Sequence, residues 1–280
     1  MSGKKTPILA LLVVVLFIIG YFPALRLLVQ KWSASEEYTH AFFAAPIMLY
    51  MLWQKRSLLE NHPPRLSAGF GLALLIFSSG LYLISLQLQI PTVSFLALVT
   101  TILSGFIYLA GFRALQKMAG PLFLLMLLIP IPDQLYSIVT LPLQLQASFV
   151  SEQVIRLFNV PVFREGNIIQ LPQKSFEVIG ACSGLRSLMT LMALSLIFGY
   201  FTLRDNTSKV ILWASSIPVA FLVNIIRLVT LVLAFQFFRL DLASGTKHTL
   251  LGVGIFGIGV AMLYLTQRML ESWEKSEKRS

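Results

Sequence analysis

Charged residues and cysteine are both scarce in this chain. Only 12% of its 280 residues are charged, whereas 56% are hydrophobic and the mean hydropathy is +0.79. That is about half the charged fraction of an ordinary soluble domain, which argues against a water-soluble fold. The single cysteine, Cys182, excludes an intrachain disulfide and a thiolate metal cluster within one chain. Cys182 is therefore either an inert packing residue or a nucleophile.

Metal-binding and phosphate-binding patterns are also missing. The three histidines, His40, His62 and His248, are scattered without HExxH spacing, and no Gly-rich phosphate loop is present. We expect neither a metal site nor a cofactor. The net charge of +10 does not indicate nucleic-acid binding, because basic residues collect in the cytoplasmic loops of membrane proteins.

Long apolar runs dominate what is present. A helix of about 20 residues crosses a hydrocarbon core of roughly 30 Å, and several runs approach that length. The expected fold is one all-α, polytopic membrane helical bundle over residues 1–280, with a charged cytoplasmic tail at 268–280. The first run follows Lys4 and Lys5 and could pass for a signal peptide, but no small-residue cleavage site follows, so we expect a retained span. The predicted spans are about eight, at 7–27, 39–53, 69–88, 92–110, 118–131, 185–203, 210–237 and 250–267.

The basic residues predict the orientation. Most lysines and arginines outside the spans fall on the side of the N-terminus, which places both termini in the cytoplasm. The segment 137–158 mixes apolar and polar residues and is expected to be an interfacial helix or a re-entrant hairpin. Counting it as a ninth span would put the basic C-terminus outside and is the weaker alternative.

In this topology residues 159–184 are extracytoplasmic. Two short apolar runs, 168–171 and 176–179, flank the turn sequence 172–175 and predict a short hairpin. Cys182 follows it directly, at the outer entrance of the sixth span.

The sequence around Cys182 can lower the pKa of a thiol. It places the sulfur at the start of a predicted helix, where unpaired backbone N–H groups favour negative charge. Arg186 lies one turn later on the same face and would add a positive charge, and Ser183 is a neighbouring supporting residue. The alternative is a small buried cysteine in a tight turn.

Two further groups are candidates for the same chemistry. Arg227 lies about ten residues from the outer end of its span, roughly 15 Å deep, where an arginine needs a partner or a wet cavity. Asn224 is one turn earlier and could orient it, although a structural arginine is the alternative. His248 sits at the outer mouth of the last span and could exchange a proton near neutral pH, or be a solvated loop residue. His40 is expected on the same side and is a lesser candidate.

These blocks resemble the exosortase and archaeosortase family. The resemblance rests on Ala181-Cys182-Ser183-Gly184-Leu185-Arg186-Ser187, on Asn224 and Arg227, and on His248 opening the last span, in that order. Segments 38–40, 130–132 and 162–167 add to it, so that it covers about residues 35–265. Archaeosortases can carry arginine at the last of these positions, so that His248 suits the bacterial branch of the family.

The resemblance implies a membrane-embedded cysteine transpeptidase of the bacterial inner membrane, with its active site on the periplasmic side. Cys182 would be the nucleophile, Arg227 the electrophilic or proton-donating group, and His248 the acid–base partner or transition-state stabiliser. The substrates would be membrane-anchored proteins with a C-terminal signal of the Pro-Glu-Pro (PEP-CTERM) type, transferred through an acyl-thioester to an envelope acceptor. The chain would be a minimal form without an extra C-terminal domain.

Three other functions remain open from the residues alone. A transporter or exopolysaccharide-export component could use Arg186 and Arg227 to bind an anionic substrate, although this leaves Cys182 unexplained. An intramembrane protease would hydrolyse the thioester and transfer nothing. A structural scaffold would need no reactive thiol at all. The sequence carries no signal for an oligomeric state, an exact substrate or an acceptor.

Overall fold

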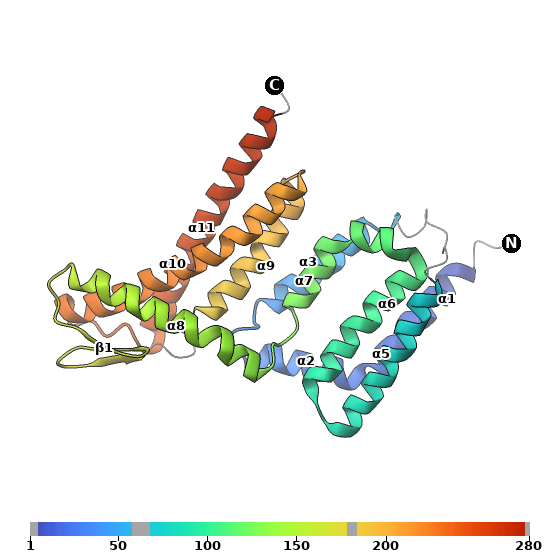
Figure 1. Ribbon diagram of the computed structural model, residues 1–280, viewed down its shortest axis with the longest axis horizontal. Coiled ribbons are helices and arrows are strands. Elements are labelled where there is room, and N and C mark those ends of the chain that lie inside the picture. The colour runs from blue at the N-terminus through green and yellow to red at the C-terminus, as the bar shows by residue number, and fades with distance from the viewer. Residues whose placement is uncertain (1–4, 58–67, 178–183, 278–280) are drawn as a thin grey trace. The chain divides into compact units, whose positions relative to one another are not determined.

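The computed structural model describes residues 5–57, 68–177 and 184–277, which form ten helices and three short strands (Figure 1). This confirms the all-α class, with one small sheet. The helices are α1 Lys5–Gly20, α2 Phe22–Ala34, α3 Ala41–Gln54, α5 Ala68–Leu88, α6 Pro91–Lys117, α7 Ala119–Leu127, α8 Asp133–Arg156, α9 Leu185–Thr202, α10 Asn206–Phe238 and α11 Gly245–Glu277. The strands are β1 Phe163–Glu165, β2 Ile168–Gln170 and β3 Ser175–Glu177.

Among the described residues, five helices are long and apolar enough to cross a membrane, namely α5, α6, α9, α10 and α11. The count rises to six if α1 and α2, which are bent by 69°, form one span. The multi-pass architecture is therefore confirmed, but the expected number of eight is not. At 1.5 Å per residue, the 14 residues of α3 and the nine of α7 reach only about 21 Å and 14 Å, too short for a membrane core.

The first expected span, 7–27, is broken at Tyr21. Pro23 occupies the first turn of α2, and a proline has no N–H to continue the hydrogen-bond ladder of a preceding helix. The apolar run predicted the membrane character of this segment correctly, but hydropathy does not report a bend.

The chain divides into two compact units, Met1–Ile131 and Pro132–Ser280, which we describe separately. In the first unit, α5 and α6 pack closely. A β-carbon placed on Gly71 of α5 would lie 2.6 Å from the backbone nitrogen of Tyr108 on α6, so only glycine allows this approach. Along the same pair of helices Thr101 donates to Ser78 at 2.9 Å and contacts the Tyr21 hydroxyl at 2.5 Å. Such small residues and hydroxyls hold helices together where lipid supplies no hydrophobic driving force.

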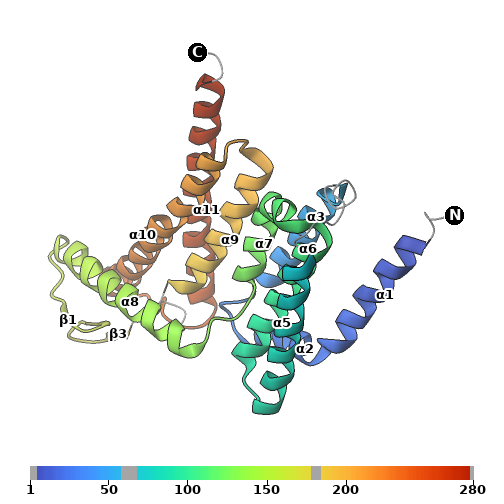
Figure 2. The same cartoon turned by 45° about the vertical axis from the view of Figure 1, so that its right-hand side comes forward.

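In the second unit, α10 packs against α9, α11 and α8, and α9 also contacts α11 (Figure 2). The core of this bundle contains Leu191 of α9, Val223 of α10 and Leu263 of α11, all almost fully buried. At one end Asp205 caps α10 by accepting hydrogen bonds from the backbone N–H of Thr207 and Ser208. The side chain of Asp205 therefore satisfies two of the unpaired backbone N–H groups at the start of α10.

Residues 137–156 of the predicted segment 137–158 lie in the single helix α8, which is not among the candidate spans. Its buried carboxylate, Glu152, accepts from Arg156 at 2.7 Å and from Arg164 of β1 at 3.2 Å. The Ser148 hydroxyl donates to the Gly166 carbonyl at 3.0 Å. These contacts attach the sheet to α8.

The predicted hairpin is confirmed. β2 pairs with β3 in antiparallel register, with Ile169 opposite Phe176, and both side chains point into a small core that includes Val232 of α10. A third strand, β1, pairs with β2 and was not predicted. The dipeptide Gly166-Asn167 between β1 and β2, with Gly166 at φ 60°, is a hairpin signal that could have revealed it.

Candidate active site

The cysteine block leads directly into α9. Cys182 and Ser183 lie outside the described residues, so their predicted roles are not addressed by the geometry. The described chain resumes at Gly184, the N-terminal cap of α9, which has a left-handed φ of 77°. A residue with a side chain adopts this conformation only with strain.

Gly184 is also fixed by its neighbour on α10. A β-carbon at Gly184 would lie 3.1 Å from the amide carbon and nitrogen of Asn224, whose side chain is buried. The predicted supporting residue Asn224 therefore lies against the start of α9, immediately after the cysteine block. This contact holds the two sequence blocks together across two helices.

The structure brings Arg227 and His248 together. Arg227 projects from α10 and is 9% exposed, and its Nη2 lies 2.6 Å from Nε2 of His248 in the first turn of α11. Arg227 is eleven residues from the end of α10 at Phe238, about 16 Å along the helix axis. A guanidinium inside a candidate span is costly, and an imidazole partner offsets part of that cost.

The hydrogen bonds of His248 define its tautomer. Nδ1 lies 3.1 Å from the backbone carbonyl of Leu242, which can only accept, so Nδ1 carries the proton. The guanidinium of Arg227 can only donate, so Nε2 presents its lone pair. In this arrangement His248 is neutral, and a proton added at Nε2 would face a cationic donor. His248 can therefore receive a proton only when Arg227 releases Nε2.

A glycine on α11 leaves room for the guanidinium. Gly252 follows His248 by one helical turn on the same face, and a β-carbon there would lie 3.7 Å from Nη2 and 4.0 Å from Cζ of Arg227. A methyl group fits at this distance, but a longer side chain would occupy the position of the guanidinium.

The sheet attaches to the loop that carries the Leu242 carbonyl. In the turn between β2 and β3, Lys174 forms an ion pair with Asp241 at 2.5 Å, and Gln173 accepts a hydrogen bond from Arg239. The hydrogen bond from Lys174 holds the pKa of Asp241 below its usual range, and the backbone N–H of Ala243 adds to this effect. The hairpin therefore anchors the segment that orients the imidazole.

The site has a positive electrostatic character. Arg186 lies in the first turn of α9, and its charge acts on both Arg227 and His248. Two guanidinium groups around a neutral imidazole favour a negatively charged species between them. A thiolate or the oxyanion of an acyl-transfer intermediate has that charge. Within the described residues, no group of three His, Cys, Asp or Glu side chains has the geometry of a metal site.

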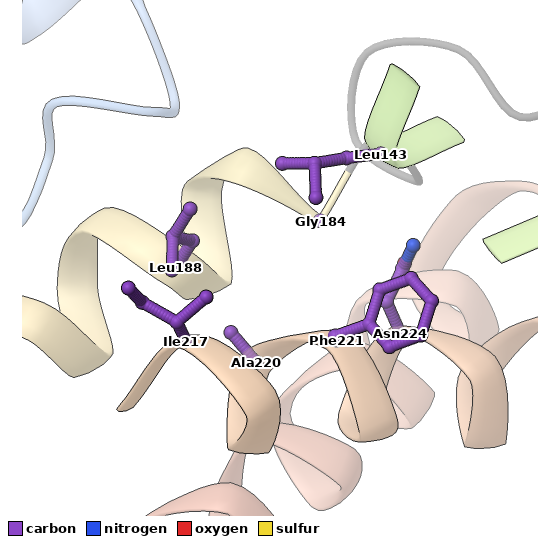
Figure 3. Close-up of a pocket in the computed structure, with 7 residues that line it drawn as sticks. All are labelled: Leu143, Gly184, Leu188, Ile217, Ala220, Phe221 and Asn224. Atoms are coloured by element: carbon purple, nitrogen blue, oxygen red, sulfur yellow. The ribbon is translucent and has the colours of Figure 1, made fainter. Parts of the chain in front are cut away.

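A pocket lies beside Gly184 and Asn224, between α8, α9 and α10 (Figure 3). It contains about 290 Å³ of space between side chains, part of it open to the surroundings. Leu188 and Ile217 face each other at one side, and Phe221 lies next to Asn224 at the other. Sequence reasoning did not identify this pocket, because its walls come from three separate segments.

The remaining predicted supporting residue, His40, belongs to the other compact unit. It is 6% exposed, and its Nδ1 lies 3.0 Å from the carbonyl of Glu37. Its predicted part in the chemistry stays a prediction.

The fold and these contacts define a multi-pass helical membrane protein with a cationic, imidazole-containing site near the ends of three packed helices. Residues 32–265 match the sequence model of a protein family that is described as transmembrane exosortase (Exosortase_EpsH). The chain belongs to this transmembrane exosortase family. No curated protein and no solved structure matches it.

Proposed function

We propose that this exosortase is a cysteine transpeptidase that cleaves the C-terminal sorting signal of membrane-anchored proteins and transfers them to an envelope acceptor. Cys182 is the nucleophile, His248 moves the protons, and Arg227 stabilises the oxyanion. The observation that carries the proposal is the hydrogen bond between Arg227 and His248, two residues of different sequence blocks that meet beside the start of α9. A packing role alone would not require a buried guanidinium on a neutral imidazole.

The reaction proceeds in two halves. The carbonyl oxygen of the bound substrate first takes the hydrogen bond of Arg227 away from Nε2 of His248. The Cys182 thiol then gives its proton to the freed Nε2, and the sulfur attacks the carbonyl carbon of the scissile peptide bond. The carbonyl electrons move to oxygen, and the oxyanion keeps the hydrogen bond from Arg227. When the intermediate collapses, the C–N bond breaks, the leaving amine takes the proton from His248, and an acyl-thioester remains.

The acceptor completes the exchange. An amine or hydroxyl of the acceptor attacks the thioester carbon and loses its proton to His248, and the C–S bond breaks. The departing sulfur then recovers a proton from His248, which regenerates the thiol. The net change replaces one peptide bond with one bond to the acceptor, and no external oxidant or reductant is needed.

The positive surroundings support this order of events. Arg227 and Arg186 favour the thiolate and the oxyanion over their neutral precursors, and N–H groups at the start of α9 supply further donors. We place the site at the periplasmic face of the bacterial inner membrane, because the basic loops predict cytoplasmic termini. Substrates with a Pro-Glu-Pro type signal followed by one membrane helix would reach it by lateral diffusion.

The experiment is a membrane-anchored reporter with such a signal, expressed with the wild-type chain or with Cys182→Ala. We expect shortening that requires Cys182, with a mass adduct on the new C-terminus. Shortening without an adduct would identify a hydrolase. If several signal variants stay intact while an anionic solute is moved in a manner that depends on Arg227 and survives Cys182→Ala, the chain is a transporter and the proposal is wrong.

A further inference from the structure

The pocket between α8, α9 and α10 has the composition of a binding site for a chain that changes from polar to apolar. Six of its lining residues are apolar or glycine, and the one polar side chain, Asn224, stands at the end next to Gly184. The lining residues from the membrane-crossing helices include Leu188 of α9 and Ala220 of α10. A ligand in this pocket therefore meets an amide at one end and hydrocarbon along the rest.

The pocket runs away from the cysteine block along the helices. Leu188 follows Gly184 by four residues, about 6 Å of helical rise, and Ile217 precedes Asn224 by seven residues, about 10 Å. Because α9 starts at Leu185, directly after Gly184, and α10 runs in the opposite direction, these residues lie progressively farther from the start of α9. Gly184 lines the pocket and is two residues after Cys182 in the sequence, a reach of at most about 7 Å of chain. A peptide held at Cys182 would therefore have its next residues near this pocket.

One wall of the pocket belongs to the outer surface of a candidate span. Ile217 lines the pocket and is 44% exposed on α10, which is long and apolar enough to cross a membrane. A side chain can therefore enter the pocket laterally, from a segment that is already in the membrane. Only about 20 Å³ of the pocket has room for a water-sized sphere, and the figure of about 290 Å³ includes space that is open to the surroundings. An aliphatic side chain can therefore lie against the pocket walls without being enclosed, and a second helix does not fit.

We infer that this pocket binds the first aliphatic side chains of the substrate's membrane helix, on the leaving-group side of the scissile bond. The inference rests on the proposed function and adds a specificity-determining subsite to it. A peptide is favoured over a lipid acyl chain because a peptide at the membrane boundary presents both a polar backbone for Asn224 and aliphatic side chains for Leu188, Ile217 and Phe221. An acyl chain is apolar along its whole length.

Ile217→Trp tests the inference by filling the pocket. We use two reporters that differ only at the first membrane residues, leucine in one and glycine in the other. The wild-type chain should process the leucine reporter about tenfold faster, because leucine makes packing contacts with the pocket walls that glycine cannot make. Ile217→Trp should abolish this preference while retaining the slower processing of the glycine reporter.

Leu222→Trp is the matched control, because Leu222 is also on α10, is 45% exposed and does not line the pocket. It should keep the wild-type preference. If Ile217→Trp and Leu222→Trp both keep the preference for leucine, the pocket does not bind the substrate and the inference is wrong.

A crosslink separates this inference from the proposed function. In a Cys182→Ser background the chain has no other cysteine, so Ile217→Cys provides one thiol in the pocket wall. Copper-phenanthroline oxidation should join it to a cysteine in the first membrane residues of the reporter, and Leu222→Cys should form no such disulfide. If position 217 forms the crosslink but the wild-type chain does not process the reporter, the proposed function is wrong and the pocket still binds the substrate. If the reporter is processed but positions 217 and 222 crosslink equally, or neither does, the proposed function holds and the pocket does not bind the substrate.

Discussion

Between α5 and α6 the polar groups are neutral hydroxyls, whereas α9, α10 and α11 enclose a guanidinium, an amide and an imidazole. Thr101 and Ser78 satisfy each other, as do Ser85 and Ser94 at 2.8 Å, and none of them carries charge. Arg227 is instead a cation in a candidate span, held to a histidine of the next helix. The hydroxyl pairs and the Arg227–His248 pair all stabilise helix contacts. Only the buried arginine costs several kcal/mol to keep within a membrane.

In a helical membrane protein, buried charged groups indicate a functional site more strongly than buried hydroxyl groups do. Each hydroxyl pair stabilises helix association by about 0.6 kcal/mol in lipid and requires no buried charge. Helix association therefore accounts for these pairs. A buried arginine is not accounted for by association alone. The comparison predicts that changes in the α5–α6 pair alter stability, whereas changes around Arg227 alter processing.

The largest expected effect comes from Arg227→Gln. Removing a donor to a developing oxyanion typically slows acyl transfer by about 10²–10³-fold, and we expect reporter processing to fall by that factor. Because Arg227 and His248 act as a pair, the double variant with His248→Gln should be hardly slower than the worse single variant. Rates come from single-turnover assays in proteoliposomes.

Thr101→Val is the control in the other unit. It removes the hydroxyl that joins Tyr21 and Ser78, so it should lower the free energy of unfolding by roughly 1 kcal/mol and leave the processing rate unchanged. Equal losses of processing in Arg227→Gln and Thr101→Val would erase the distinction between the two regions.

The next effect is at Gly252. Leucine there would extend into the space of the guanidinium, and we expect Gly252→Leu to slow processing about tenfold or more, since small displacements of catalytic groups are costly. Gly252→Ala should remain close to wild type, because a methyl group fits 3.7 Å from Nη2. Gly254→Leu, where a β-carbon meets nothing within 4 Å, is the matched control on the same helix. A slow Gly254→Leu with a normal Gly252→Leu would contradict the packing described here.

The α5–α6 contact provides a smaller effect, confined to stability. Gly71→Ala places a β-carbon 2.6 Å from the backbone of Tyr108, so the helices must separate, at a cost of roughly 1–3 kcal/mol. Gly80→Ala, on the same helix with open space around it, should cost nothing or stabilise slightly. Denaturant titration of the purified chain in micelles compares the two, and equal midpoints would refute the close approach.

The smallest effect concerns the ion pair between Lys174 and Asp241, which is partly exposed and worth less than about 1 kcal/mol. The pKa of Asp241 is lowered in the folded chain, so the pair stabilises the fold above the usual carboxylate range and loses its contribution as the pH falls through the lowered pKa. Asp241→Asn should therefore lower the unfolding midpoint slightly at pH 7, and the two midpoints should converge in strong acid. A difference that grows on acidification would have the wrong sign for this pair.

Several elements followed from local sequence. The runs that became α5, α9 and α10 were found because about twenty apolar residues in succession specify a helix wherever lipid is the solvent. The β2–β3 hairpin followed from two apolar runs around a turn sequence. The bend at Tyr21 and the shortness of α7 did not follow, because hydropathy measures composition and not the path of the backbone.

Only part of the candidate site could be predicted from the sequence. Arg227 and His248 were chosen separately, one for its depth and the other for its position at a helix entrance. Nothing in the spacing predicted that they share a hydrogen bond, or that Gly252 rather than Gly254 faces the guanidinium. The Lys174–Asp241 pair was missed because it joins residues 67 positions apart.

The amino-acid sequence was enough to predict a helical membrane protein with the motif blocks of an exosortase, because the need to pair backbone groups in lipid and the identity of each residue are local properties. The contact of Asn224 with Gly184, the Nδ1–H tautomer of His248 and the apolar pocket beside them emerged only from the folded chain. Each of these depends on which faces of α9, α10 and α11 meet, and that choice is made by the packing of side chains from distant parts of the chain.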